Sequence, residues 1–216
     1  MKPFNTLPRT DGWPARFIGV VCVAALSACS VLKPSTTEPP AFYALNAAPT
    51  TVPLRAPDSA TRTLPTLIIT PTRAAAGFDS QRIIYVRHAH QLEYFAHNEW
   101  IDTPARMLGP LLASSMEATG AFGAVVVTPA GASGDLRLET DIIRLQHNFE
   151  TRPSRVQFTL RAYLLDDKTR RVLAWREFHG EATAPSDTPA GGVAAANQAV
   201  QAELTKLAQF VAAHPR

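Results

Sequence analysis

Three of the six histidines, His88, His90 and His97, are the residues most suited to metal chemistry in this 216-residue chain. Residues two apart on a strand share a face, so His88 and His90 would point the same way. His97 lies beyond the next expected strand, no cysteine is near, and the His-x-x-x-His spacing of a helical zinc pair is absent. We therefore predict turn or surface histidines and no metal site.

Two other segments have residue types found in hydrolase sites. Gly131–Asp135 places Ser133 among glycines, but it lacks the G-x-S-x-G pattern and lies between two expected strands. Asp166 and Asp167 are adjacent, so on a strand they would face opposite ways and could not act as paired carboxylates. Both segments are predicted to be hairpin connections. With no GxxxxGK[ST] loop and no convergent acid, base or nucleophile, the sequence predicts a protein that is not an enzyme and needs no cofactor.

The remaining reactive residues are the two cysteines, Cys22 and Cys29. An apolar run over residues 17–28 contains Cys22 and follows a basic region with Lys2, Arg9 and Arg16. Because the run is shorter than the roughly 20 residues that cross a bilayer, it predicts a cleaved secretory signal. Leu26-Ser27-Ala28-Cys29 resembles the lipobox of bacterial lipoproteins. That resemblance implies cleavage between Ala28 and Cys29, diacylglycerol on the Cys29 thiol and acylation of the new amino group; the alternative is an ordinary signal with a chance cysteine.

Cleavage at that position changes how the composition is interpreted. Of 21 basic and 18 acidic residues, three basic and one acidic precede Cys29, which leaves 18 and 17. This balance gives no support for a nucleic-acid partner. The mature chain would hold no free thiol and no disulfide, so core burial must stabilise it. Several acyl chains anchor a protein stably to a membrane, and by similarity to lipoproteins of double-membrane bacteria, Ser30 in place of Asp implies the outer membrane.

Three segments are expected along the chain: a signal peptide over residues 1–28, a lipidated tether over 29–65 and one domain over 66–216. The tether is rich in Pro, Ser and Thr and includes a short strand at Phe42–Leu45. Thr103-Pro104 and Thr188-Pro189 are helix starts, since Thr suits the N-cap and Pro the first helical position. They predict helices from Thr103 to Thr119 and from Thr188 onward, with Gly191 and Gly192 weakening the first turn of the second helix.

Strands account for most of the rest of the domain. Leu67–Ile69, residues 82–87 and residues 91–96 are the short candidates, and the four candidates after the first helix are residues 122–128, 135–146, 155–166 and 171–183. In residues 155–166 every second side chain is apolar, which is typical of an antiparallel strand with one buried face. We therefore predict an α+β fold with two layers: a mainly antiparallel sheet and two amphipathic helices.

The order of these features resembles the ABC-type transport auxiliary lipoproteins, the family of paraquat-inducible protein C. The resemblance rests on Cys29, the Phe42-Tyr43-Ala44-Leu45 segment, the strand at residues 82–87, the Asn98-Glu99-Trp100 turn before the helix at Pro104, and the Ala-rich last helix. It implies a periplasm-facing lipoprotein that docks to an MCE-domain protein and the ABC permease and ATPase of the same lipid transport system. The resemblance also implies a non-enzymatic subunit that can assemble as a homo-oligomeric ring. Two alternatives remain: a carrier lipoprotein that binds lipid or a small ligand itself, and an assembly factor for an outer-membrane β-barrel.

Two short regions are candidates for the partner contact. Trp100 lies next to a helix start, where an aromatic residue is either a core plug or, since Trp is enriched at interface hot spots, a contact. Its neighbours Asn98 and Asp102 complete the first candidate region. Phe42 and Tyr43, close to the tether, form the second; they could instead simply pair as an edge strand.

Overall fold

The computed structural model describes residues 39–46, 64–129 and 131–214. Residues 39–216 form one compact unit, and the paragraphs below concern this unit alone. Cys29, the predicted signal peptide and much of the predicted tether lie outside the described residues. None of the helices within the described ranges is long and apolar enough to cross a membrane.

The longest strand, β7 (Leu136–Asn148), is the centre of the sheet. On one side it pairs antiparallel with β8 (Arg155–Asp166), which pairs antiparallel with β9 (Val172–Thr183). All three strands and the Asp166–Thr169 hairpin connection confirm the prediction for this part of the chain. The Asp166–Thr169 turn works because the Asp166 carboxylate accepts the backbone N–H groups of Lys168 and Thr169, at 3.0 and 2.9 Å.

The other side of β7 is occupied by three short strands that follow one another along its length. These strands run parallel to β7 and are β2 (Thr66–Ile69), β3 (Arg73–Ala74) and β4 (Arg82–Val86). Three further strands extend the sheet: β6 (Ala124–Val127) beside β2, β5 (Glu93–Trp100) beside β4, and β1 (Ala41–Tyr43) beside β5. The sheet is therefore mixed, with long antiparallel pairs and short parallel ones.

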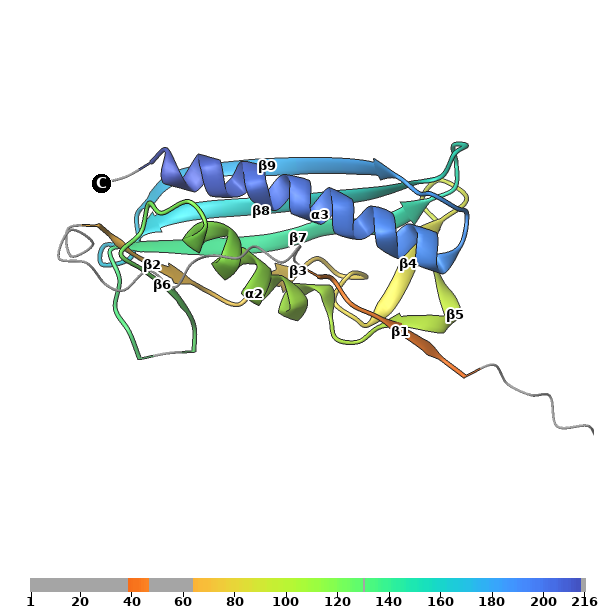
Figure 1. Ribbon diagram of the computed structural model, residues 1–216, viewed down its shortest axis with the longest axis horizontal. Coiled ribbons are helices and arrows are strands. Elements are labelled where there is room, and N and C mark those ends of the chain that lie inside the picture. Colours follow the sequence, from red (N-terminus) through yellow and green to blue (C-terminus); the bar gives the residue numbers. More distant parts are fainter. Residues whose placement is uncertain (1–38, 47–63, 130, 215–216) are drawn as a thin grey trace, which may run out of the picture. The chain divides into compact units, whose positions relative to one another are not determined.

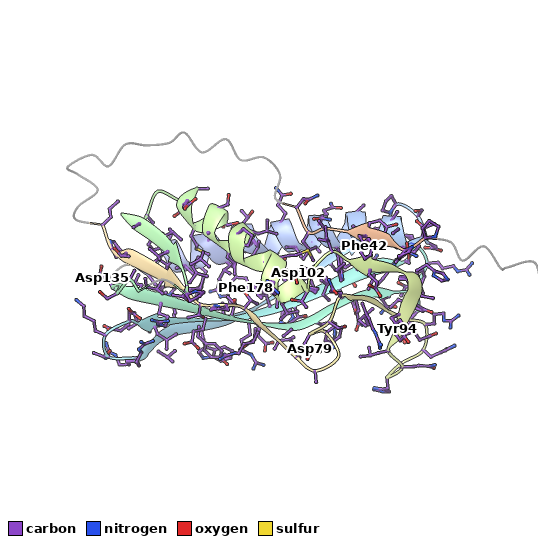
Figure 2. All side chains as sticks on the ribbon, turned by 90° about the horizontal axis from the view of Figure 1, so that it is seen from below. Phe42, Asp79, Tyr94, Asp102, Asp135 and Phe178 are labelled. Carbon is purple, nitrogen blue, oxygen red and sulfur yellow. The ribbon has the colours of Figure 1, made fainter. Side chains whose placement is uncertain are left out.

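Both helices cover the same face of this sheet, as Figures 1 and 2 show. The shorter helix, α2 (Pro104–Glu117), contacts β2, β6 and α3 (Pro189–Ala212), and α3 runs along β7, β8 and β9. Both begin at the predicted Thr-Pro pairs. The Thr188 hydroxyl accepts from the backbone N–H of Gly191 at 3.1 Å, whereas Thr103 makes no side-chain cap. The α+β fold and its two-layer arrangement are confirmed.

The expectation that Gly191 and Gly192 weaken the start of α3 was wrong, because the helix begins at Pro189. A Cβ added at Gly191 would lie 2.2 Å from the Ser186 carbonyl oxygen, and one at Gly192 would lie 2.4 Å from Nδ1 of His147. The glycines permit α3 to start this close to its surroundings, so tertiary packing outweighs their poor helix propensity.

The core lies between the two layers. The inward face of β8 contributes Val156, Phe158, Leu160, Ala162 and Leu164, all buried as the alternation predicted. They pack against the apolar side of α3, which includes Leu204, Leu207 and Val211. The outward face of the same strands is polar, and ion pairs such as Arg161–Glu177 and Arg155–Glu181 join β8 to β9 there. One face of the sheet therefore holds the fold together while the other faces solvent.

Candidate functional site at the tether end

We call the end of the domain that holds β1, β4, β5 and the start of α3 the tether end, because the described chain enters there at Pro39 (Figure 1). The opposite end, with the β8–β9 turn and Asp135, is the hairpin end (Figure 2). Both predicted contact regions lie at the tether end. Strand β1 pairs with β5 so that Ala41 is opposite Asn98 and Tyr43 is opposite Trp100. The structure thus joins two regions that the sequence left separate.

Hydrogen bonds hold this junction together. The Tyr43 hydroxyl donates to Oδ1 of Asn98 at 3.1 Å, and the backbone N–H of Ile101 donates to the Tyr43 carbonyl at 2.7 Å. Asp102 accepts from the backbone N–H of Thr103 at 2.7 Å and forms an ion pair with Arg106 at 3.3 Å. Asn98 and Asp102 are therefore occupied in positioning β1 and the start of α2.

Trp100 is only 3% exposed and belongs to the core, so its ring is not part of the contact surface proposed from the sequence. Alternation explains this: Trp100 and Tyr43 share the inward face, and Phe42, one residue away, faces outward and is 57% exposed. Ile101, which lies within the first candidate contact region, is 61% exposed directly after β5. Phe42 and Ile101 are the accessible apolar side chains of this junction.

A pocket of about 380 Å³ opens at the same end, and no sequence pattern had indicated it. Its floor is a cluster of three aromatic rings: Tyr85 lies 4.5 Å from Phe95 and 5.8 Å from Phe149, centroid to centroid. Charged residues from three separate segments surround the rings, namely Arg87, Arg152 and Asp187. The pairing of β4 with β7 brings Arg87 near the segment after β7, and the Ser154–Asp187 hydrogen bond brings in the turn before α3.

The two arginines of the pocket differ in their partners. Nε and Nη2 of Arg87 donate to the two oxygens of Glu93, and this pairing lowers the pKa of Glu93. The guanidinium of Arg87 also lies 5.5 Å from the Tyr85 ring centroid, within cation–π range. Arg152 makes no hydrogen bond and no ion pair with the described part of the chain, and it is exposed.

Behind the pocket lies a buried polar chain that fixes Asp187. The Ser154 hydroxyl donates to Oδ1 of Asp187 at 2.5 Å and lies 2.9 Å from Nε2 of His147. Because that hydroxyl has a single proton, its oxygen must accept from Nε2–H, which leaves Nδ1 of His147 as an acceptor. Among the described residues, this buried Nδ1 has no partner. The hydrogen bond from Ser154 lowers the pKa of Asp187, and burial lowers the pKa of His147.

This chain of residues is not a nucleophile site. In a Ser-His-Asp triad the histidine lies between the serine and the carboxylate, whereas here the serine lies between them and is fully buried. Its effect is structural: it fixes the Asp187 carboxylate at the pocket wall, next to the start of α3.

The histidines and hydrolase-like segments noted in the sequence lie outside the pocket, except His88, which lines it. His88, His90 and His97 are exposed, and within the described ranges no group of three His, Cys, Asp or Glu side chains could hold a metal ion. Asp167 is buried at the hairpin end, where it pairs with Nε of Arg137 at 2.6 Å and accepts the backbone N–H of Gly134 at 2.9 Å. The bond from Gly134 holds the Gly131–Asp135 loop against the β8–β9 turn. The prediction that this loop is a hairpin connection was wrong, because β6 pairs with β2 and not with β7.

Comparison with solved structures supports the fold. Protein XCC0632 from Xanthomonas campestris has a TM-score of 0.68 at 23% identity, covering 80% of this chain and 94% of that one. A second, uncharacterized protein has a TM-score of 0.62 at 15% identity, covering 81% and 99%. PelC from Paraburkholderia phytofirmans, solved as a dodecamer, reaches only 0.38 at 14% identity over 67% and 89%. At these identities the likeness shows the fold alone.

A search of curated proteins gave no match. The family model of the ABC-type transport auxiliary lipoprotein component, however, matches residues 43–208. The match begins at the last residue of β1 and ends within α3, so it covers β2 to β9, α2 and most of α3. The chain belongs to the ABC-type transport auxiliary lipoprotein family.

Proposed function

We propose that this protein is a non-enzymatic, outer-membrane lipoprotein that serves as the docking subunit of an ABC/MCE-type system for lipids or other hydrophobic molecules. The family match over residues 43–208 carries this proposal. Acylation of Cys29 anchors the chain, and the domain faces the periplasm and binds the MCE-domain subunit of the same system. Assembly as a homo-oligomeric ring is part of the proposal.

The shape of the tether end supports the docking proposal. Phe42 and Ile101 are large apolar side chains exposed on neighbouring positions of the β1–β5 edge. The backbone beneath them is fixed by the Tyr43–Asn98 and Ile101–Tyr43 hydrogen bonds, so little ordering entropy is lost on binding. A rigid apolar patch beside a polar rim is the arrangement of an interface core.

Partner capture with two variants separates anchoring from docking. Cys29→Ala should move the protein out of the membrane fraction while the domain still binds the MCE-domain subunit. Phe42→Ser should leave the protein in the membrane but weaken capture of that subunit after crosslinking, about ten-fold if Phe42 is a hot spot.

Val172→Ser is the matched control, since Val172 is an exposed apolar residue of β9 at the hairpin end. It should change neither membrane retention nor capture. Absence of the MCE-domain subunit from crosslinked wild-type samples would exclude docking, and wild-type protein without bound acyl chains would exclude the anchor.

The carrier alternative has one observation in its favour. A groove of about 320 Å³ lies between α2 and α3, with Leu111, Val200 and Leu204 among its lining residues. Protein pockets that bury a small ligand start at about this size. If the protein is a carrier, Leu204→Gln should release cargo that wild-type protein retains in native mass spectrometry.

A further inference from the structure

The aromatic pocket at the tether end has both signs of charge at its wall. Arg87 and Arg152 contribute guanidinium groups, and Asp187 contributes a carboxylate. A simple anion bound near the arginines would also meet the negative charge of Asp187. A ligand with a phosphate at one end and an ammonium at the other would match both.

The rings strengthen the match to an ammonium group. The cluster of Tyr85, Phe95 and Phe149 forms the floor, and an ammonium ion is attracted to the face of such rings. Asp187 cannot turn away readily, because the buried Ser154 holds it at 2.5 Å. The cation-binding half of the pocket is therefore preformed.

The phosphate-binding half has free donors. Nη1 of Arg87 and the whole guanidinium of Arg152 have no hydrogen-bond partner within the described residues. Guanidinium groups bind phosphate oxygens through paired N–H donors. We propose that this pocket binds the zwitterionic phosphate–ammonium headgroup of a phospholipid, with the phosphate on Arg87 and Arg152 and the ammonium against Asp187 and the rings.

The position of the pocket identifies a lipid as the source of this headgroup. The pocket residues Tyr85 and Phe95 belong to β4 and β5, which lie at the same end of the domain as β1 (Figure 1). Pro39, two residues before β1, is ten positions after Cys29. Ten extended residues span at most about 35 Å. Given the proposed acylation of Cys29, on which this step depends, the pocket can reach the bilayer that holds the anchor. The loop that carries Arg87 also exposes Leu92 and leads to the exposed ring of Tyr94, and such residues suit a membrane interface.

Native mass spectrometry of the full protein, purified in detergent from membranes, tests the proposal. Equal amounts of palmitoyl-oleoyl phosphatidylethanolamine and phosphatidylglycerol are added, and retained lipid is counted. The first lipid has the ammonium and the second lacks it. We expect phosphatidylethanolamine to be retained about ten-fold more than phosphatidylglycerol.

Three variants show which side chains cause the preference for phosphatidylethanolamine over phosphatidylglycerol. Asp187→Asn keeps an acceptor for Ser154 but removes the charge, and should abolish the preference for phosphatidylethanolamine. Arg152→Ala removes no hydrogen bond and no ion pair of the described residues, only the attraction of its charge for the Asp187 carboxylate, and should reduce retention of both lipids. Arg171→Ala, which removes an exposed arginine at the hairpin end, should change neither.

The opposite results would overturn the proposal. Equal retention of the two lipids, a preference for phosphatidylglycerol, or an unchanged preference in Asp187→Asn would exclude the zwitterion site. Complete displacement by millimolar phosphoethanolamine would identify a soluble ligand, and equal displacement by inorganic phosphate would identify a plain anion site. The mass of the chain itself reports acylation, so failure of the proposed anchor is seen separately from failure of the pocket.

Discussion

The two ends of the domain use polar residues differently. At the hairpin end the buried carboxylates are satisfied: Asp167 binds Arg137 and the Gly134 N–H, and Asp166 accepts from its own turn. At the tether end Arg152 is unpaired among the described residues, and a buried histidine nitrogen lacks a partner. Polar groups that are fully paired stabilise a fold, whereas unpaired ones remain available to a ligand or remain a cost. This contrast is the basis of our proposal that the hairpin end stabilises the fold and that the tether end binds a ligand.

Replacing a tryptophan by alanine should give the largest difference in unfolding free energy between the two ends. Trp100 is 3% exposed at the tether end, and Trp175 is 61% exposed at the hairpin end, where its ring stacks 6.4 Å from Tyr163. Trp100→Ala should lower the free energy of unfolding by about 4 kcal/mol, since it opens a core cavity. Trp175→Ala should lower it by about 0.5 kcal/mol, because it removes only a surface cross-strand pair. Urea denaturation of both variants measures the gap, and equal losses would contradict the assigned burial.

Breaking the buried ion pair at the hairpin end should give the second largest loss of unfolding free energy. Asp167→Ala leaves Arg137 and the Gly134 N–H without their acceptor, so we expect a loss of about 3 kcal/mol in unfolding free energy. Glu181→Ala breaks the exposed pair with Arg155 and a long hydrogen bond from Nε2 of Gln157 at 3.4 Å, and should cost less than about 1 kcal/mol. Thermal denaturation of the two variants distinguishes these cases. A similar small loss in both would mean that the hairpin end does not depend on its buried carboxylate.

Glycine substitutions test the close packing behind the pocket. Gly192→Ala places a Cβ 2.4 Å from the His147 ring, and overpacking of this kind should cost about 2 kcal/mol. Gly109→Ala lies inside α2, where a Cβ would meet no heavy atom within 4 Å beyond its chain neighbours and the backbone of the helix. Its gain in helix propensity is offset because Pro110 disfavours the helical conformation of a preceding residue that has a Cβ, so we expect a change of less than about 1 kcal/mol. The calorimetric melting temperature should therefore fall much further in Gly192→Ala than in Gly109→Ala. A stabilising Gly192→Ala would show that α3 does not approach His147 so closely.

The pH dependence of stability should show the smallest effect. Burial holds the pKa of His147 below its ordinary value, and the charge of Asp187 opposes this shift. The unfolded chain therefore binds the proton more tightly than the folded one, so this contribution to stability is present above about pH 6.5 and is lost as the pH falls through the folded-state pKa.

Urea midpoints at pH 7.5 and 5.5, in wild type and His147→Gln, isolate the contribution of this histidine. The variant should lose less stability than wild type between the two pH values. The lowered pKa values of Asp167 and Asp187 make their contributions persist until the pH falls below about 4, outside this window. An equal change in both proteins would remove His147 as the cause.

The local elements were predictable where the pattern was long and the signals were strong. The alternation of residues 155–166 predicts β8 and its buried face, and the Thr-Pro pairs predict where α2 and α3 begin. Strand β3 has two residues and no pattern, and the parallel pairing of β2, β3 and β4 with β7 depends on contacts between residues far apart in sequence. No local rule encodes such pairings.

Part of the candidate site was likewise predictable from the sequence, and part was not. Composition and spacing placed Phe42, Tyr43, Asn98, Trp100 and Asp102 among the contact candidates, but the β1–β5 register decided that Phe42 faces outward and Trp100 inward. The pocket had no sequence signal, because its rings and charges come from β4, β5, the segment after β7 and the turn before α3.

The sequence by itself determined the α+β class, the strand faces and the helix starts, since these depend on periodicity and on side chains that satisfy nearby backbone groups. Only the tertiary structure decided the mixed sheet, the need for Gly192 beside His147, and the meeting of Arg87, Arg152 and Asp187 around one pocket. Those features arise where distant segments come within a few ångströms of each other, and that proximity is set by burial of the whole core rather than by any local pattern.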